Sequence, residues 1–386
     1  MICVDPKYHA EKLDPELAKL VPETVKIVAT GALPLILTRP FGLAGEIGLR
    51  GFFQLRGAIE QSISDRRPDA ILITGSPFYP MLLSNWIRQR WNISVVLDFQ
   101  DPWVSHEGAS RVKWTKGWLA HRLAVVLEPR ALRGASWVTS VSERQNLEMV
   151  ERHPSLNPSR MSAIPIGGDP EDFVALRGLA PNNENVGKFT FSYVGTALPR
   201  STPLLKALFR GLSVLRKRNP AVAARLAFRF VGTSNQPGRS TDYRVMHLAQ
   251  AAGVAEFVVE EPVRVPYLDA LRVLASTDAT LMIGSDEPHY TASKIYPCLM
   301  SGRPFLSLFH PESSAHSILA AAGGGVPLAF SSDAQAGKLE RAVADAIERI
   351  VLSPESIGSI NPTAFADYTA HAVAGKFADV FERAGA

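Results

Sequence analysis

The first half of the chain alternates short apolar runs with longer amphipathic segments. The apolar runs predict buried strands at Val25–Thr30, Ala70–Thr74, Val95–Phe99, Trp137–Val141 and Ala163–Ile166. The segments between them have helical spacing and predict helices at Leu49–Arg66, Met81–Trp91, Lys116–Leu132 and Glu143–Arg152. Strands that are apolar along their whole length are typical of a parallel sheet covered by helices on both faces, so this half predicts a Rossmann-like module.

The same alternation restarts after a polar segment, Pro181–Lys188, which predicts an interdomain linker. Strands are predicted at Phe189–Val194, Ala227–Val231, Glu256–Val259, Ala279–Ile283, Phe305–Phe309 and Val326–Phe330. Helices are predicted at Pro203–Arg216, Tyr243–Ala252, Tyr267–Ser276, Ser293–Ser301, Ser313–Ala322, Ala334–Val351 and Ala364–Ala386.

This order predicts an α/β protein with two doubly wound, Rossmann-like domains. We place the first domain at residues 1–180 and the second at 186–360, and we expect the closing helix, at about 364–386, to pack back on the first domain. In tandem modules of this kind the ligand is expected between the domains, at the carboxyl ends of both sheets.

The composition is that of an ordinary globular protein. Of 386 residues, 46% are hydrophobic and 20% charged, the formal net charge is +4, and each of two domains can bury a core. The two cysteines, Cys3 and Cys298, match no metal or redox spacing, so we expect no disulfide and a reducing, cytoplasmic compartment. No apolar run approaches the roughly 20 residues that span a bilayer, and the N-terminus does not resemble a secretory signal.

Candidate chemistry gathers in Asp286–Pro304, where a predicted strand leads into a predicted helix. Thr291 and Ser293 are good N-cap residues, and Lys294 lies in or beside the first helical turn. A lysine there is unfavourable for the helix, because the helix N-terminus already carries about half a positive charge. The pattern therefore predicts that an anion binds beside Lys294.

The segment Arg111–Arg133 is basic. It holds six basic residues and two tryptophans against a single acid, Glu128, a composition suited to anionic lipid headgroups. A solvated helix face with buried tryptophans is an equally good interpretation of the same residues.

Four motifs follow one another in an order that carries further information. They are VVLDFQDPW at Val95–Trp103, WVTSVSERQ at Trp137–Gln145, IPIGGDPEDF at Ile164–Phe173 and SKIYPCLMSGRP at Ser293–Pro304. Together they resemble the GT-B glycosyltransferases, particularly the family 4-like retaining enzymes of bacterial polysaccharide synthesis. The resemblance covers nearly the whole chain and implies the GT-B fold, in which two Rossmann-like domains face each other across a cleft.

The resemblance implies a nucleotide-sugar as co-substrate, with no other cofactor and no metal ion. Negative charge grows on the diphosphate as the glycosidic bond breaks, so the main task is to stabilise the leaving group. Backbone N–H groups, a cation and small residues can do this. The nucleotide-binding residues that it implies are Gly195, Thr196, Arg200, Tyr290, Thr291, Ser293 and Lys294. Catalytic roles are expected for Lys294 and Asp101, and the alternative for Asp101 is a turn-capping aspartate.

The chain departs from the family pattern at several of these positions. Aligned on Lys294, the two motif glutamates become His289 and Pro297, neither of which is a carboxylate. Thr196 and Ser201 stand where the family has an arginine and a lysine. Two alternatives to sugar transfer therefore remain: a nucleotide-sugar 2-epimerase, and a catalytically inactive binding or scaffold protein of a polysaccharide cluster.

A further departure lies at the N-terminus, where Ile2–Val4 resembles the second strand of the family's first domain. The first β–α unit of that domain is therefore expected to be missing. We expect a chain extended upstream to be more soluble and more stable, and equal stability of the two forms would contradict this interpretation.

The function expected from the sequence is that of a glycosyltransferase of the hexosyltransferase type. It is expected to move a sugar from a nucleotide-sugar to a carbohydrate or lipid-linked acceptor in cell-envelope or exopolysaccharide synthesis, and the resemblance alone implies retention of the anomeric configuration. We expect it to be cytoplasmic and peripheral to the inner face of the membrane, and to bind no nucleic acid.

Overall fold

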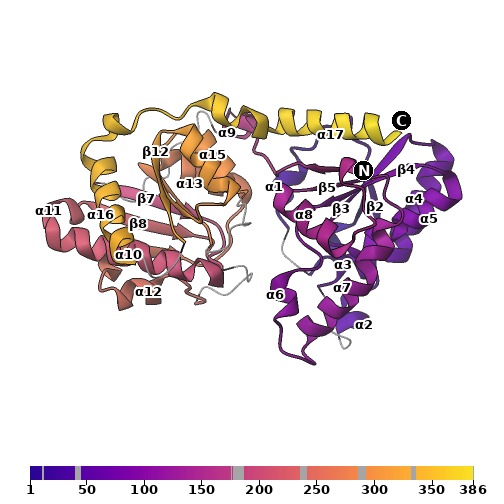
Figure 1. Cartoon of the computed structure of the whole chain (residues 1–386), viewed down its shortest axis with the longest axis horizontal. Coiled ribbons are helices and arrows are strands. Elements are labelled where there is room, and N and C mark those ends of the chain that lie inside the picture. The colour runs from indigo at the N-terminus through magenta and orange to yellow at the C-terminus, as the bar shows by residue number, and fades with distance from the viewer. Residues whose placement is uncertain are drawn as a thin grey trace. The chain divides into compact units, whose positions relative to one another are not determined.

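The computed structural model of the chain describes residues 1–10, 13–39, 45–174, 176, 187–234, 241–285, 293–331 and 336–385. They form two compact units, one of Met1–Ile166 with Ala374–Ala386 and the other of Gly167–Val373. The chain leaves the first unit before the expected boundary at residue 180, and it returns to that unit within α17 (Ala370–Gly385). Each unit combines parallel strands with helices, so the expected α/β class is confirmed (Figure 1).

The first unit contains two parallel sheets. In one, β1 (Ile2–Val4) pairs with β2 (Val28–Thr30), and the other has the order β3–β4–β5–β6. The strands of the second sheet are β3 (Ala70–Gly75), β4 (Ser94–Phe99), β5 (Trp137–Ser140) and β6 (Met161–Ala163). The helices are α1 (Pro15–Ala18), α2 (Leu35–Thr38), α3 (Ile47–Arg50), α4 (Phe52–Asp65), α5 (Leu83–Trp91), α6 (His106–Ala109), α7 (Lys116–Leu132) and α8 (Glu143–Arg152).

The core of the first unit is built on the second of these sheets. Apolar residues of β3, β4 and β5 pack against side chains from α4, α5, α7 and α8. The C-terminal helix is tied to the same sheet, because the Ser94 hydroxyl at the start of β4 donates a hydrogen bond of 2.6 Å to the Ala384 carbonyl.

The described residues of the second unit form one parallel sheet with the order β12–β11–β10–β7–β8–β9. Its strands are β7 (Phe189–Val194), β8 (Leu226–Val231), β9 (Val258–Glu261), β10 (Ala279–Ile283), β11 (Phe305–Phe309) and β12 (Gly325–Ala329). The helices are α9 (Pro170–Val174), α10 (Thr202–Arg218), α11 (Pro220–Ala223), α12 (Met246–Ala251), α13 (Tyr267–Ser276), α14 (Ile295–Met300), α15 (Ser314–Ala322) and α16 (Ala336–Leu352). This is the doubly wound order of a Rossmann-like domain.

Helices cover both faces of this sheet. On one face, strand residues such as Phe191 and Leu281 pack with α10, α12 and α16. On the other, Met282 and Phe305 pack with α13, α14 and α15. Because successive residues of a strand point to opposite faces, a fully buried strand such as β10 supplies both cores.

The ends of several elements differ from the predicted ones. β6 ends at Ala163, three residues before the predicted end, and its ladder with β5 runs from Met161 instead of from Ala163. Pro165 lacks the N–H that would extend the ladder. The closing helix begins at Ala370, after a 3₁₀ segment over Pro362–Tyr368. Residues 181–186 of the predicted linker lie outside the described residues.

Candidate functional site

The strand order of the second unit reverses between β7 and β10. From β7 the chain runs outward through β8 and β9, then returns to β10 on the other side of β7. Loops that leave two such strands diverge at their carboxyl ends, which is where open α/β sheets bind ligands. Gly195 follows β7 directly, and Gly284 and Ser285 follow β10.

Lys294 lies at this edge of the sheet. Its ammonium group donates a hydrogen bond to the Tyr193 hydroxyl and lies 4.2 Å from the centroid of the Tyr193 ring. A Cβ placed on Gly195 would lie 3.7 Å from Lys294 Cδ, so the aliphatic part of the lysine passes close to the bare backbone of Gly195. The structure therefore brings the predicted residues Gly195 and Lys294 together.

Tyr193 fixes this arrangement from the core. Its hydroxyl donates a hydrogen bond of 2.8 Å to the Thr196 carbonyl. Burial raises the pKa of Tyr193 above its ordinary value, so the phenol stays protonated and remains a donor. One hydroxyl thus links Lys294 to the turn after β7.

The turns after β7 and β10 are also tied to each other. Gly195 has a φ of +129°, a conformation that a side chain would disfavour, and its N–H donates to the Val231 carbonyl at 2.9 Å. The buried Ser201 hydroxyl donates to the Gly284 carbonyl at 2.6 Å. The predicted residue Thr196 lies in the turn after β7, Arg200 lies in the 3₁₀ segment Pro199–Ser201 that follows it, and both are partly buried.

The start of α14 differs from the prediction. The helix begins at Ile295, its N-cap is Lys294, and no side chain caps it, so the expected capping role of Ser293 is wrong. Ser293 is exposed and accepts a 3.3 Å hydrogen bond from the Tyr296 N–H through its carbonyl. Pro297, where the family has a glutamate, is the third residue of α14. Tyr290 and Thr291, with His289, lie outside the described residues.

In the first unit, the two aspartates of the DFQDPW motif have different surroundings. Asp98 is buried, and its carboxylate accepts hydrogen bonds from Thr74 at 3.0 Å and Thr139 at 2.7 Å, which joins β3, β4 and β5. Asp101 is exposed, in the turn after β4. Its carboxylate makes no hydrogen bond or ion pair with any residue that the structure describes, so the turn-capping alternative has no support there.

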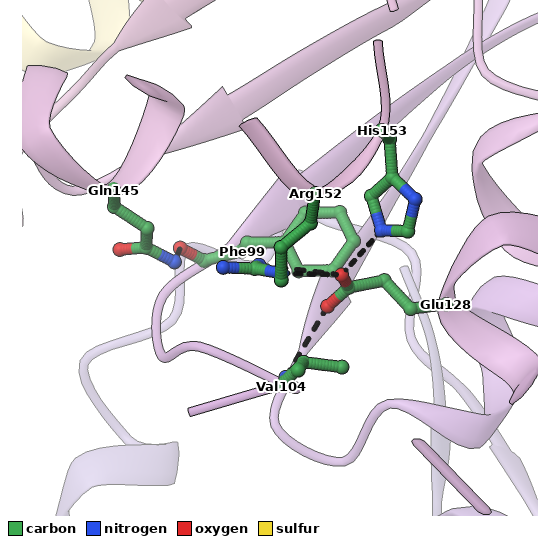
Figure 2. Close-up of polar contacts among 6 residues, drawn as sticks. All are labelled: Phe99, Val104, Glu128, Gln145, Arg152 and His153. Atoms are coloured by element: carbon green, nitrogen blue, oxygen red, sulfur yellow. Dashed lines mark hydrogen bonds and ion pairs between the residues drawn. The ribbon is translucent and has the colours of Figure 1, made fainter. Parts of the chain in front are cut away.

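A buried carboxylate that sequence reasoning did not single out lies behind this turn. Glu128 of α7 is fully buried, and Figure 2 shows the donors that surround it. Arg152 donates to its Oε1 at 3.2 Å, His153 lies 2.7 Å from the same oxygen through Nε2, and the Val104 N–H donates to Oε2 at 3.2 Å. The sequence signal was weak, because a glutamate inside an amphipathic helix usually faces solvent.

Two contacts hold the turn that carries Asp101. On its near side, the Gln145 amide donates to the Phe99 carbonyl at 3.1 Å. On its far side, Glu128 accepts from the backbone of Val104 (Figure 2). The exposed aspartate therefore stands on a backbone fixed at both ends.

Within the described ranges, no group of three or more His, Cys, Asp or Glu side chains could hold a metal ion. None of the helices in that part of the chain is both long and apolar enough to cross a bilayer.

The N-terminal part of the chain matches a family model. Residues 10–167 match the family model described as a glycosyl transferase 4-like domain. A search of the curated proteins finds no match.

Solved structures resemble nearly the whole chain. The structure of HepE from Anabaena in complex with UDP-glucose has 14% sequence identity and a TM-score of 0.61, and the match covers 93% of this chain and 86% of HepE. Sucrose-phosphate synthase from Thermosynechococcus elongatus has 13% identity and a TM-score of 0.60, with coverage of 94% and 84%. The UDP-forming trehalose-phosphate synthase from Burkholderia xenovorans has 11% identity and a TM-score of 0.56, with coverage of 86% and 79%.

At these sequence identities the structural matches show the fold, which is the GT-B fold. The matched family model describes the N-terminal part of the chain only. The chain therefore has the GT-B fold and carries a glycosyl transferase 4-like domain over residues 10–167.

Proposed function

We propose that the second unit binds a nucleotide-sugar and that the chain transfers its sugar to a carbohydrate or lipid-linked acceptor in cell-envelope or exopolysaccharide synthesis. The reaction proceeds with retention, needs no metal ion or further cofactor, and takes place at the cytoplasmic face of the membrane. The observation that carries this proposal is the position of Lys294 beside Gly195, at the strand-order reversal between β7 and β10.

The surroundings of Lys294 suit a diphosphate. Without a Cβ, Gly195 lets a phosphate oxygen approach the backbone, and the lysine beside it supplies positive charge. As the bond between sugar and diphosphate breaks, negative charge grows on the leaving oxygen, and a cation already in place stabilises that charge more than it stabilises the bound donor. Tyr193 holds the ammonium group in position, so little reorganisation is needed.

Asp101 is proposed to act on the acceptor. Its carboxylate is exposed, and its turn is fixed by Gln145 and Glu128. A carboxylate in such a place can accept a hydrogen bond from the attacking hydroxyl and orient it, which is a contribution of positioning. The relatives support the substrate class, since HepE was solved in complex with UDP-glucose and one trehalose-phosphate synthase in complex with glucose-6-phosphate.

The proposal is tested by incubating the purified chain with uridine, guanosine and adenosine diphosphate sugars and measuring nucleotide release with and without acceptor glycans. Charge-assisted hydrogen bonds contribute roughly 1.5–3 kcal/mol each, so Lys294→Ala should lower the release rate at least about tenfold. The matched control is Lys206→Ala, an exposed lysine on α10 of the same unit, which should leave the rate unchanged.

Three other outcomes would each overturn the proposal. Equal rates of nucleotide release in the two lysine variants would show that Lys294 takes no part in the reaction. An isomerised donor would indicate a 2-epimerase. Donor binding without turnover would indicate a scaffold protein, the alternative favoured by Pro297, which puts an imino acid into α14 where the family has a carboxylate. Anomeric proton couplings of the product, measured by NMR, test retention separately.

A further inference from the structure

The outward face of α7 is apolar and basic at the same time. Leu119, Leu123 and Val126 recur at helical spacing and are 52%, 43% and 49% exposed. Arg122 and Arg130 lie on the same face and are exposed. A surface helix normally turns its apolar stripe to the core, so this helix has a second apolar stripe that the unit itself does not cover.

The segment before α7 extends this face with larger side chains. Val112 is 74% exposed and Trp114 is 81% exposed. Trp114 has a φ of +67°, in the left-handed region that bulky side chains disfavour. The turn is nevertheless held, because the Thr115 hydroxyl donates to the Val112 carbonyl at 2.7 Å and its oxygen accepts from the Trp118 N–H at 3.3 Å. A strained and hydrogen-bonded turn therefore projects a tryptophan into solvent.

The exposed charge of the segment Arg111–Arg133 is of one sign. The segment's basic residues are all exposed: Arg111, Lys113, Lys116, Arg122, Arg130 and Arg133. Its single acid, Glu128, is 0% exposed and engaged by Arg152 and His153, so it contributes nothing to the outer face. The ratio of six basic residues to one acid in the sequence thus becomes six to none at the surface.

We call the segment Arg111–Lys116 and the outward side of α7 the docking face. We propose that the docking face binds the surface of an anionic lipid bilayer. Trp114, Val112 and the leucines enter the boundary between headgroups and acyl chains, and the six basic side chains contact lipid phosphates. Charge complementarity and projecting apolar side chains favour a bilayer over a soluble polyanion, which would leave the apolar residues in water. The inference rests on the proposed function, because it gives that activity its place at the membrane.

The test is cosedimentation of the full chain with vesicles of phosphatidylcholine alone and of an equimolar mixture of phosphatidylcholine and phosphatidylglycerol. Binding is expected only to the anionic vesicles and should weaken as salt is added. Each basic residue near such a surface contributes roughly fivefold to partitioning, so the triple variant Arg122→Gln, Arg130→Gln, Arg133→Gln should bind on the order of 100-fold more weakly. The matched control is Lys206→Gln, Arg210→Gln, Lys217→Gln on α10, which removes the same charge from the other unit and should bind as the unchanged chain does.

The apolar contribution is tested separately with Trp114→Ala, for which we expect at least about a threefold loss. Its control is Tyr243→Ala, an aromatic residue 49% exposed in the second unit.

Three outcomes would overturn the inference. They are equal binding to both kinds of vesicle, equal loss in the two triple variants, and binding to dextran sulfate with none to anionic vesicles. Circular dichroism of each variant confirms folding. Nucleoside diphosphate binding, measured by calorimetry without vesicles, shows whether the proposed function holds when vesicle binding fails.

Discussion

Tyr193 serves the core and the candidate site at the same time. Its ring lies in the core cluster and packs with Phe230 at 5.6 Å between centroids, while its hydroxyl meets Lys294 and the Thr196 carbonyl. Tyrosine suits this double role because one end of its side chain is apolar and the other polar. The hydroxyl adds little to the core, so its removal should be visible mainly at the site.

The variant Tyr193→Phe isolates that hydroxyl. It keeps the ring and should lower the free energy of unfolding by about 1 kcal/mol, because the Thr196 carbonyl loses its donor. Nucleotide release should slow by roughly threefold to tenfold, because Lys294 is held less well. Denaturant unfolding and steady-state kinetics measure the two effects. Tyr243→Phe, at an exposed position, should change neither, and an unaltered rate in Tyr193→Phe would show that the hydroxyl does not position the lysine.

Cys298 gives a prediction about pH. Burial raises the pKa of its thiol from 9.0 to about 12, so the folded chain holds the proton more tightly than the unfolded chain. The stability that this provides is fully present below pH 9.0 and is lost as the pH rises toward 12. The free energy of unfolding should therefore fall less steeply with rising pH in Cys298→Ala than in the unchanged chain. Over this range the two slopes should differ by roughly 1 kcal/mol per pH unit. An unchanged slope in Cys298→Ala would contradict this assignment. In the unchanged chain, a thiol reagent should modify the partly exposed Cys3 and reach Cys298 only on unfolding.

At the scale of elements, α7 separates two tasks on opposite faces. Its outward side belongs to the docking face. Its inward side carries Glu128, which joins the end of α8 to the backbone after β4. A buried carboxylate with several donors cannot be removed without leaving those donors unpaired. The helix therefore fixes the turn of Asp101 through one side chain.

Glu128→Gln should accordingly be costly. Arg152 and His153 lose their charged partner, and we expect the free energy of unfolding to fall by about 3 kcal/mol. Glu60→Gln, which breaks an exposed pair with Arg90, should cost less than about 1 kcal/mol. If the turn positions the acceptor, the KM for acceptor should also rise in Glu128→Gln at temperatures at which it is folded. Equal stability losses in the two variants would contradict the assigned role of the network.

The contact between α10 and α16 depends on Gly211, whose missing side chain lets the two helices approach. A Cβ there would lie 2.5 Å from Val343 Cγ1 and 2.8 Å from the Glu340 carbonyl oxygen. Gly211→Ala should therefore destabilise the chain by about 1–3 kcal/mol in chemical denaturation, despite the better helix propensity of alanine. Gly337→Ala in α16, where nothing lies within 4 Å of the added atom, should be neutral or slightly stabilising.

The sequence predicted the strands and longer helices because a parallel sheet imposes apolar runs and helical spacing that can be read directly. It also singled out Lys294, since a lysine at a helix start conflicts with the helix dipole, and the structure brings that lysine beside Gly195. It could not identify Tyr193 or Glu128, because their roles depend on which residues from other elements surround them. The start of α14 was predicted two residues too early, because Ser293 is a favourable N-cap type and yet no side-chain cap forms there.

At the scale of the whole molecule, the two units have separate cores. One cluster of buried side chains fills the first unit, and two clusters cover the faces of the sheet in the second. A unit with its own core can unfold on its own, so the chain should show two thermal transitions. The variants above assign them, because Glu128→Gln should lower the transition of the first unit and Gly211→Ala that of the second.

This assignment allows the nucleotide site to be tested without any turnover. A nucleoside diphosphate that binds only the folded second unit stabilises it by about 2.7 kcal/mol at a hundredfold excess over its Kd. For a unit of this size, scanning calorimetry should then show the midpoint of the Gly211-sensitive transition rising by roughly 5–10 °C. The Glu128-sensitive transition should stay in place, and Lys294→Ala should abolish most of the rise while Lys206→Ala preserves it. A ligand that raises the other transition, or that stabilises Lys294→Ala as well as the unchanged chain, would place the diphosphate elsewhere.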